Sequence, residues 1–326
     1  MALDLGSDNL KVVEVVQRGS NFELRDFLVK RLPKSLIKSN QFDFNQVVEI
    51  LRPIFKNRFS AANLSLIISG SRIITKLLDL PQVEDEELDK LVSWEVQNII
   101  AKPLEELVID YELLSADENR MKVLVVITYK ELLLKEINLL ESLGLQVTKV
   151  KAAPLLWRKI LSTELKDKNL AIIDLGEQET ELTVLREEEF DFRRIFYLGG
   201  SHFTAEIEEG QDLSYRKAKA LKESSEFKLD LVSDSLNKLV KKISLSIHYW
   251  EQQEKEIEQV LLTGGSAKLK GLKKMIAKKL NVEVNLLAGY EQFQFAKGEF
   301  SFHSLKEELP FLIPSLSALL DENKIS

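Results

Sequence analysis

The sequence predicts an α/β protein built from two related domains around a central cleft. Nearly the same motif occurs twice, at residues 2–16 and 170–185: an apolar strand, an Asp-x-Gly turn and a second strand. Strand and helix patterns alternate in both halves, which favours α/β sheets over separate all-α and all-β parts. The length of 326 residues suits two domains.

Composition indicates a soluble globular protein. The chain is 44% hydrophobic and 30% charged, and no apolar run approaches the ~18 residues that span a bilayer. Asp4 and Asp8 lie where a signal peptide would need basic and apolar regions, so we expect a cytoplasmic location. The lack of cysteine excludes disulfides and thiolate metal sites, and three scattered histidines argue against zinc. The net charge of −7 argues against general nucleic-acid binding.

The first half opens with the strand pair 2–16 and 22–31. Apolar residues at helical spacing predict a helix over 43–56. Acidic residues at 84–87 suit the start of a second helix, which Pro103 ends. The other elements expected in this half are strands at 64–68, 73–80, 107–114, 121–128 and 145–151, and a helix at 130–143 with Gly144 as its C-cap.

The second half alternates strands and helices in the same way. The expected elements are a helix at 153–165, the hairpin at 170–185, a strand at 190–198, a charged helical region at 202–254 with breaks near 213–214 and 230, a strand at 260–262, a helix at 269–280 and an amphipathic helix at 313–320. Residues 287–310 carry no clear pattern.

Three glycine-bearing turns form the candidate site. The Asp-x-Gly tips at 4–6 and 174–176 would direct backbone N–H groups toward one point, which suits a phosphate, and each aspartate is a candidate Mg²⁺ ligand. A plain hairpin turn is the alternative for either copy alone, but two equivalent copies favour a nucleotide between two domains. The third turn, at 263–266, offers a flat, side-chain-free surface for a nucleoside.

In order and spacing these turns resemble the actin-type ATPase superfamily, which includes actin, sugar kinases and FtsA. Within it, the chain resembles the PilM family of type IV pilus assembly proteins. Four further stretches carry this resemblance: Ser69–Ser71 with Leu80-Pro81 and Trp94–Gln97, Lys102–Tyr111, Leu139–Leu145, and Tyr197–Gly200 with Ala218–Lys222. Together with the turns they cover almost the whole chain.

The resemblance implies an actin-like ATPase fold with four FtsA/PilM-type subdomains. Their expected bounds are 1–76 with about 151–166 for subdomain 1A, 77–150 for 1C, 167–201 and 240–326 for 2A, and 202–239 for 2B. It also implies a scaffold of a type IV pilus assembly (inner-membrane alignment) complex. The partner would be a PilN-like inner-membrane protein, whose cytoplasmic N-terminal peptide docks between 1A and 1C. Other pilus assembly proteins are expected partners as well.

Matching positions imply the residues of an ATP and Mg²⁺ site. Asp4 and Asp174 would face Mg²⁺, and Ser7 and Lys11 would contact the β- and γ-phosphates. The remaining matches are Gly6, Gly176 and Thr180 in the phosphate loops, Gly264, Gly265 and Ser266 in the nucleoside turn, and Lys222 near the adenosine. Alternatively, Lys11 is an ordinary strand-surface lysine and Lys222 a solvated lysine on a lysine-rich helix.

The phosphate loops depart from the family pattern. Asp8, Glu177 and Glu179 stand where relatives tend to have small or hydroxylated residues, and each solvated carboxylate would repel a triphosphate by about 1 kcal/mol. A nucleotide-free relative, like the cytoplasmic domain of GspL, is therefore an alternative to an ATP-binding scaffold. A slow ATPase is another, although no residue is identified to position an attacking water, and the short 2B region argues against a sugar kinase.

Three further features remain open. Only three residues precede Asp4, fewer than in relatives, so we expect either that the chain is trimmed at its N-terminus or that the first loop is poorly anchored. Residues 315–320 lack the glycine that the family has in its last helix. The lysine-rich segment 268–279 is interpreted as a solvated helix face, with contact to anionic lipid or another protein as the alternative.

Overall fold

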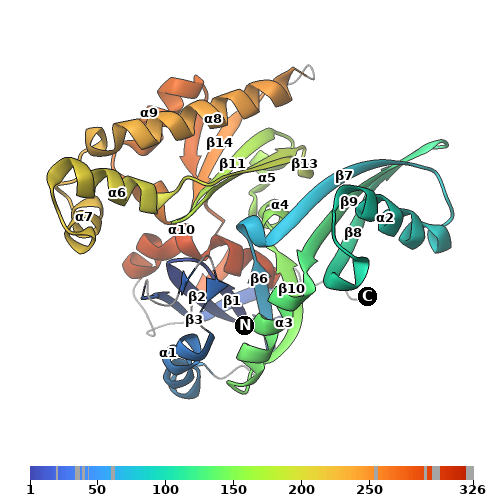
Figure 1. The fold of residues 1–326 in the computed structure, drawn as a ribbon, viewed down its shortest axis with the longest axis horizontal. Helices are drawn as coiled ribbons and strands as arrows, with labels where there is room; N and C mark the ends of the chain where they lie inside the picture. Colours follow the sequence, from blue (N-terminus) through green and yellow to red (C-terminus); the bar gives the residue numbers. More distant parts are fainter. Residues whose placement is uncertain are drawn as a thin grey trace. The chain divides into compact units, whose positions relative to one another are not determined.

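The computed structural model describes residues 1–19, 21–33, 37–38, 41–42, 44–59, 63–252, 256–289, 292–295 and 302–320. The chain divides into two compact units (Figure 1): unit 1 is Met1–Lys34 with Ala153–Ser326, and unit 2 is Ser35–Ala152. Strands and helices occur together in both units, so the predicted α/β class is confirmed.

The first strands of unit 1 form an antiparallel meander. β1 (Ala2–Leu5) pairs with β2 (Asn9–Arg18), and β2 pairs with β3 (Asn21–Arg31). A late segment, β16 (Phe293–Phe295), adds parallel to β3. All four residues of β1 are buried and paired with β2, so the first Asp-x-Gly turn is firmly held at the hairpin tip.

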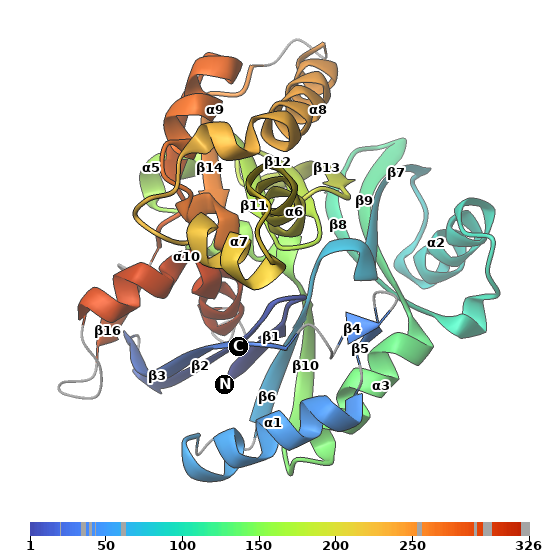
Figure 2. The same ribbon diagram turned by 60° about the vertical axis from the view of Figure 1, so that its left-hand side comes forward.

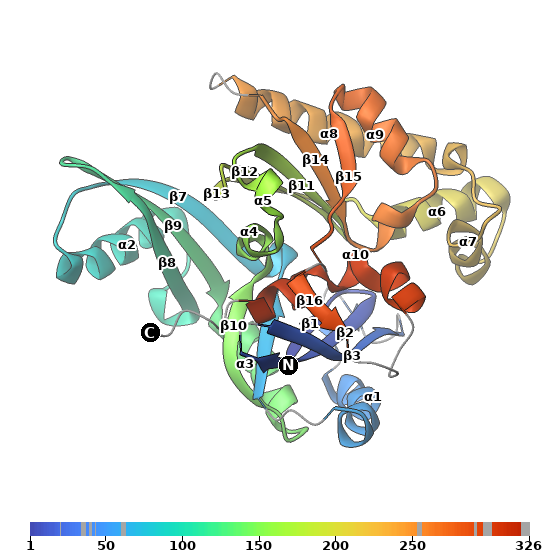
Figure 3. The same ribbon diagram turned by 180° about the vertical axis from the view of Figure 1, so that it is seen from behind.

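In a second sheet of unit 1, the other two glycine turns lie at the carboxyl ends of neighbouring strands. Its strand order is β13 (Glu189–Phe196), β12 (Thr180–Arg186), β11 (Asn169–Leu175), β14 (Gln259–Thr263) and β15 (Glu283–Leu286). The β11–β12 hairpin carries the second Asp-x-Gly turn at its tip. β14 runs parallel to β11, with Thr263 beside Asp174 (Figure 3). The turn after Thr263 therefore lies at the same end of the strands as the second Asp-x-Gly turn.

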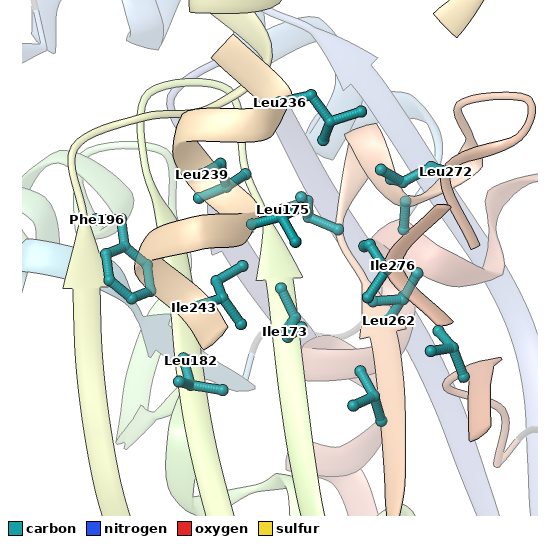
Figure 4. Packing of buried hydrophobic residues seen from close by; sticks show 14 of the residues in the cluster. Ile173, Leu175, Leu182, Phe196, Leu236, Leu239, Ile243, Leu262, Leu272 and Ile276 are labelled. Atoms are coloured by element: carbon teal, nitrogen blue, oxygen red, sulfur yellow. The ribbon is translucent and has the colours of Figure 1, made fainter. Parts of the chain in front are cut away.

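Two helices cover one face of this sheet with apolar side chains. They are α8 (Ser233–Glu251) and α9 (Leu272–Leu280). Leu239 and Ile243 of α8 lie over Ile173 and Leu182 of the strands in Figure 4. The buried positions of α8 recur at helical spacing, at 236, 239, 240, 243, 247 and 250. Each such side chain contributes roughly 1.5–3 kcal/mol by leaving water.

The remaining helices of unit 1 agree with the sequence prediction except at two places. Residues 200–232 form α6 (Gly200–Gln211), α7 (Tyr215–Lys222) and the short η5 (Leu229–Val232), so the breaks expected near 213–214 and 230 are confirmed. The helix predicted at 153–165 is wrong. It is divided into η4 (Ala153–Leu155), α4 (Trp157–Ile160) and α5 (Thr163–Lys166) because Leu161 and Ser162 are extended, and Ser162 favours a helix N-cap over a helix interior.

The last helix, α10 (Phe302–Leu319), begins earlier than the prediction of Ile313, although it contains Pro310 and Pro314. A proline inside a helix lacks the N–H that would bond the carbonyl four residues earlier. Pro314 thus leaves the Pro310 carbonyl without its helical donor. That carbonyl instead accepts bonds of 3.0 Å each from the Gly264 N–H and the Thr263 hydroxyl. The tertiary contact compensates for the helix bond, and it ties α10 to the third glycine turn, which continues as η6 (Gly265–Lys268).

Unit 2 contains a three-stranded sheet with one helix packed on it (Figure 2). The strand order is β7 (Ile73–Pro81), β9 (Arg120–Tyr129) and β8 (Leu107–Ala116), and α2 (Asp85–Ile99) covers one face through Leu88, Val92 and Val96. The other elements are β4 (Ile37–Lys38), β5 (Gln41–Phe42), α1 (Phe44–Asn57), the parallel pair β6 (Asn63–Ile68) and β10 (Gln146–Ala152), η2 (Gly70–Arg72), η3 (Leu104–Glu106) and α3 (Lys130–Glu141). The bounds of α1, α3 and of β6 to β10 lie within two residues of the predicted ones. α2 ends at Ile99, before the predicted end at Pro103, and β4, β5, η2 and η3 were not predicted. Gly144, at φ +82, follows the end of α3 as expected.

No helix in the described part of the chain combines the length and the apolar character needed to cross a bilayer.

We expect Thr263→Val to destabilise the protein. Thr263 is fully buried and donates its hydroxyl to the Pro310 carbonyl, so valine keeps the shape but removes this bond. The expected loss is about 1 kcal/mol, or a melting temperature lower by roughly 2–4 °C. Thermal and urea unfolding measure it, with Thr263→Ser as the control that retains the donor. Equal stability of the valine variant and the wild type would show that the hydroxyl contributes nothing.

Candidate functional site

The sequence-predicted site residues converge within unit 1. Gly200, the first residue of α6, shows the convergence most clearly. A Cβ added there would lie 2.6 Å from Glu177 Oε2, 2.7 Å from Ser266 Oγ and 3.1 Å from Lys222 Nζ. The second loop, the third turn and α7 therefore meet around one backbone position, where a Cβ would displace the ends of three side chains.

Asp4 and Asp174, the aspartates of the two Asp-x-Gly turns, belong to the same site. Asp4 is 2% exposed, and its Oδ2 accepts a bond of 2.7 Å from Lys11 Nζ. Lys11 is thus engaged with Asp4, and the interpretation as an ordinary surface lysine is wrong. Asp4 Oδ1 is buried and has no hydrogen-bond partner among the described residues. Burial raises the pKa of Asp174 to about 7, with Glu181, Asp4 and Glu179 adding to the rise and Lys11 opposing it.

These carboxyl groups fit a Mg²⁺ ion. The unpartnered oxygen of Asp4 lacks a donor or cation, and the raised pKa of Asp174 shows that Lys11 alone does not offset the burial of its carboxylate. Among the residues that the structure describes, no three His, Cys, Asp or Glu side chains gather into a metal site. Mg²⁺ keeps several waters and is commonly held by one or two carboxylates, so Asp4 and Asp174 would suffice.

Close packing alone accounts for several site glycines. Gly264 has φ +84, and a Cβ there would lie 2.3 Å from Asp174 Oδ1. A Cβ at Gly265 would lie 2.7 Å from the Phe311 ring, and one at Gly176 would lie 2.8 Å from the Glu179 carbonyl. Gly6 closes the first hairpin tip by donating its N–H to the Asn9 carbonyl at 3.0 Å. Packing therefore accounts for Gly176, Gly264 and Gly265 whether or not a ligand binds, whereas the bond of Gly6 uses a backbone N–H that other residues also have.

Other predicted ligand groups are already engaged inside the protein. Thr180 is fully buried and donates its hydroxyl to the Leu198 carbonyl at 2.7 Å. The first amides of α6 donate to the second loop, Gly200 N to Gly176 O at 2.9 Å and Ser201 N to Glu177 O at 2.8 Å. Ser7 and Glu179 are half-buried in the two loops. Donors that a phosphate would use at a helix start thus have partners in the structure.

A cluster of ion pairs neutralises two of the three unexpected loop acids, Asp8 and Glu177. Lys219 Nζ lies 2.5 Å from Asp8 and 3.2 Å from Glu177. Lys222 Nζ lies 3.6 Å from Glu177 and donates to the Gly200 carbonyl at 2.6 Å. The members of this cluster, called the loop ion cluster below, are Asp8, Arg31, Glu177, Tyr215, Lys219, Lys222 and Glu223.

Burial and the neighbouring charges act in opposite directions on the pKa values of Glu177 and Lys222. Burial alone would raise the pKa of Glu177, but Lys222 and Lys219 hold it below its ordinary value. Burial lowers the pKa of Lys222, with Glu177 opposing the change. Burial, together with Glu177, raises the pKa of Tyr215, which therefore stays a hydrogen-bond donor. The interpretation of Lys222 as a solvated lysine is wrong, since its side chain is only 5% exposed.

The sequence prediction missed Lys219, Tyr215 and Arg31. A signal for two of them was present, because residues 215, 219 and 222 recur at intervals of four and three and share one face of a helix. Two lysines and a tyrosine on one face, in a chain with three unexplained loop acids, indicate a paired cluster. No such local signal marks Arg31, which reaches Asp8 and Glu223 from β3.

Two Asp-x-Gly hairpins and a third glycine turn, assembled around a pair of aspartates on α/β sheets, define a protein of the actin-like ATPase fold. Solved structures share this fold. One is a chain of the PilM-PilN type IV pilus biogenesis complex, with a TM-score of 0.89, 22% identity, and coverage of 97% of this chain and 96% of that chain. EutJ from Carboxydothermus hydrogenoformans has a TM-score of 0.58 and 12% identity, over 98% of this chain and 88% of that chain. MreB5 of Spiroplasma citri bound to AMPPNP has a TM-score of 0.50 and 10% identity, over 88% and 90%.

The family model described as type IV pilus assembly protein PilM matches residues 2–314. The chain therefore belongs to the PilM family of type IV pilus assembly proteins.

The Asp174 carboxyl gives stability a pH dependence. Its pKa of about 7 in the folded protein lies above the ordinary value of 3.8, so the unfolded chain releases this proton first as pH rises. The free energy of unfolding therefore falls between about pH 4 and pH 7, by at most ~1.4 kcal/mol per pH unit. Asp174→Asn lacks this decline, and we expect its stability relative to wild type to increase from about pH 5 to about pH 8.

Urea unfolding at the two pH values measures this difference. Asp110→Asn, at an exposed position of β8, is the control for loss of one carboxylate. A difference between Asp174→Asn and wild type that stays constant with pH would contradict the raised pKa.

Proposed function

We propose that the protein is a cytoplasmic scaffold of a type IV pilus assembly complex, held at the inner membrane through its partner. The observation that carries this proposal is the family match over residues 2–314, together with the likeness to a chain of the PilM-PilN complex over nearly all of both chains. Among the site residues that the structure describes, no nucleophile lies beside a base, so we assign no catalytic residue and propose at most weak ATP hydrolysis.

The proposed partner is a PilN-like inner-membrane protein. Its cytoplasmic N-terminal peptide would dock between the subdomains predicted as 1A and 1C. The name of the matched complex, which pairs PilM with PilN, supports this partner. In the predicted 1C segment, α2 presents Trp94, which is 59% exposed, and an exposed aromatic side chain is a common anchor in peptide docking.

We further propose that unit 1 binds ATP with Mg²⁺. Asp4 and Asp174 would hold the ion, Ser7 and Lys11 would contact phosphates, and the turn at Gly264, Gly265 and Ser266 would receive the nucleoside. Bound Mg²⁺ would supply positive charge that neutralises phosphate oxygens. The convergence of these residues and the structure of MreB5 with AMPPNP support this proposal.

A nucleotide-free scaffold is the second candidate, and a specific observation favours it. Lys219 and Lys222 are already paired with carboxylates, and the first amides of α6 are already bonded to the second loop. ATP would have to compete with Asp8 and Glu177 for these cations. The choice between the two candidates therefore depends on the strength of the loop ion cluster.

Glu177→Gln separates the two candidates. Glutamine keeps the shape of the side chain but removes the charge that neutralises Lys219 and Lys222, so the affinity for Mg-ATP should rise by roughly 1 kcal/mol, or about fivefold. The free energy of unfolding should fall by about 1–3 kcal/mol, because buried lysines lose a partner. Binding of a fluorescent ATP analogue and thermal unfolding measure the two effects.

Glu226→Gln, at an exposed position with the same charge change, is the matched control. An equal gain of affinity in this control would mean that net charge, and not the cluster, limits binding. If neither wild type nor Glu177→Gln binds Mg-ATP, the nucleotide-free scaffold is correct.

Peptide docking is tested by calorimetric titration with the cytoplasmic N-terminal peptide of the PilN-like protein from the same organism. We expect saturable binding of that peptide and none of a scrambled one. The fluorescence of Trp94 should change when the peptide binds. Trp157 and Trp250 are each 1% exposed, so their emission should stay constant. Trp94→Phe should remove the fluorescence change. Failure of the peptide to bind, with or without Mg-ATP, would overturn the proposed partner without bearing on the nucleotide site.

A further inference from the structure

Two neighbouring helices of unit 1 present a row of lysines away from the sheet. The cationic surface consists of Lys238, Lys241 and Lys242 on α8 and Lys273, Lys274, Lys278 and Lys279 on α9, all exposed. Both helices turn their apolar sides to the same face of the five-stranded sheet, as Leu239, Ile243, Leu272 and Ile276 show in Figure 4. The opposite sides of the two helices therefore point outward together, and they carry Lys238, Lys241, Lys242, Lys274 and Lys278. Lys273, which bonds Asn285 of β15, and Lys279, three positions after Ile276, are exposed nearer the packed side of α9.

These lysines have no acidic partners among the residues that the structure describes. Within α9 there is no acidic residue, and in α8 the two acids, Asp234 and Glu251, lie at the ends of the helix. Lys273 donates to the side chain of Asn285 at 2.7 Å, a neutral group. Seven exposed lysines of two neighbouring helices thus lack an acidic partner, in a chain whose net charge is −7, in contrast to the paired lysines of the loop ion cluster.

Apolar side chains continue the lysine row along α8. Leu245 is 59% exposed and Tyr249 is 57% exposed. Positions 238, 242, 245 and 249 recur at intervals of four, three and four, so the two side chains lie on the same stripe of the helix as the lysines. Solvation explains single surface lysines, but it does not explain an exposed leucine and tyrosine beside them. Lysine, leucine and tyrosine together are typical of a surface that meets a lipid headgroup layer.

We infer that the cationic surface, with Leu245 and Tyr249, binds the anionic headgroups of a membrane. Clusters of four to eight lysines attract acidic lipid, and apolar side chains beside them insert at the headgroup boundary. The same helices would suit nucleic acid poorly, because the chain as a whole is acidic. The contact uses no residue of the glycine turns or of the loop ion cluster, so it is independent of nucleotide and peptide binding.

The test is co-sedimentation of the full chain with phosphatidylcholine vesicles, with and without phosphatidylglycerol. We expect binding to the vesicles that contain phosphatidylglycerol, and at least ~10-fold weaker binding to phosphatidylcholine alone or at high salt, which screens exposed charges. Leu245→Ser with Tyr249→Ser should weaken the binding that remains at intermediate salt.

Charge reversal identifies the surface. The fourfold variant K273E/K274E/K278E/K279E should bind at least ~10-fold more weakly. The matched control K76E/K90E/K217E/K228E changes the charge equally at exposed lysines elsewhere and should bind like wild type. Because glutamate near the end of α9 opposes the helix macrodipole, K238E/K241E/K242E on α8 is a second variant with the same expected loss. Circular dichroism confirms that each variant folds.

Two results would overturn the inference. One is the absence of wild-type binding to phosphatidylglycerol vesicles at low salt, which would leave an acidic protein as the partner of this surface. The other is an equal loss of binding in the matched control and in the α9 variant. Peptide and nucleotide titrations on the same variants should match wild type, so failure here is distinguishable from failure of the proposed function.

Discussion

Lys219 connects parts of the chain that are far apart in sequence, and the site depends on that connection. Its ammonium pairs with Asp8, which is 211 positions away, and with Glu177 of the second loop. Without it, two acidic loops of unit 1 would repel each other. With it, and with Lys222 beside Glu177, the hairpin tips are joined to α7 by charge-assisted bonds between largely buried groups. Such pairs stabilise chiefly because breaking one leaves an uncompensated buried charge.

The loop ion cluster changes the effect that the loop carboxylates are expected to have on phosphate binding. In isolation Asp8 and Glu177 oppose a triphosphate, but in the structure each is matched by a lysine. The repulsion expected from the sequence is therefore replaced by a competition, in which a bound phosphate gains a lysine only when a carboxylate gives it up. The ion pairs of the loop ion cluster hold the two loops together without a bound ligand. This property suits a scaffold. The fold and the PilM family membership are compatible with either outcome of the competition.

The lysines of α8 and α9 differ from those of the loop ion cluster in their surroundings. The lysines of α7 are buried and paired, whereas those of α8 and α9 are exposed and have no described acidic partner. Both sets look alike in the sequence, as lysine-rich helical segments with apolar residues at helical spacing. What separates them is the element each helix packs against. The loops that face α7 contribute carboxylates that pair with its lysines. The sheet face under α8 and α9 contributes mainly apolar side chains, and its polar contacts with α8, from Asp191 to Trp250 and from Arg194 to Ser246, involve none of the lysines.

The sequence by itself determined the α/β class, most strand and helix bounds and the three glycine turns, because these depend on local periodicity, helix-terminal charge and turn chemistry. Tertiary structure decided the rest. α10 continues through Pro310 and Pro314 because Gly264 and Thr263 donate to the Pro310 carbonyl. From the local sequence alone, each proline predicts the end or a kink of the helix. Lys11 is paired with Asp4, which lies opposite it in the same hairpin. Lys219 and Lys222, in contrast, are paired rather than solvated because their partners come from distant loops, and pairing over such separations is set by packing rather than by spacing.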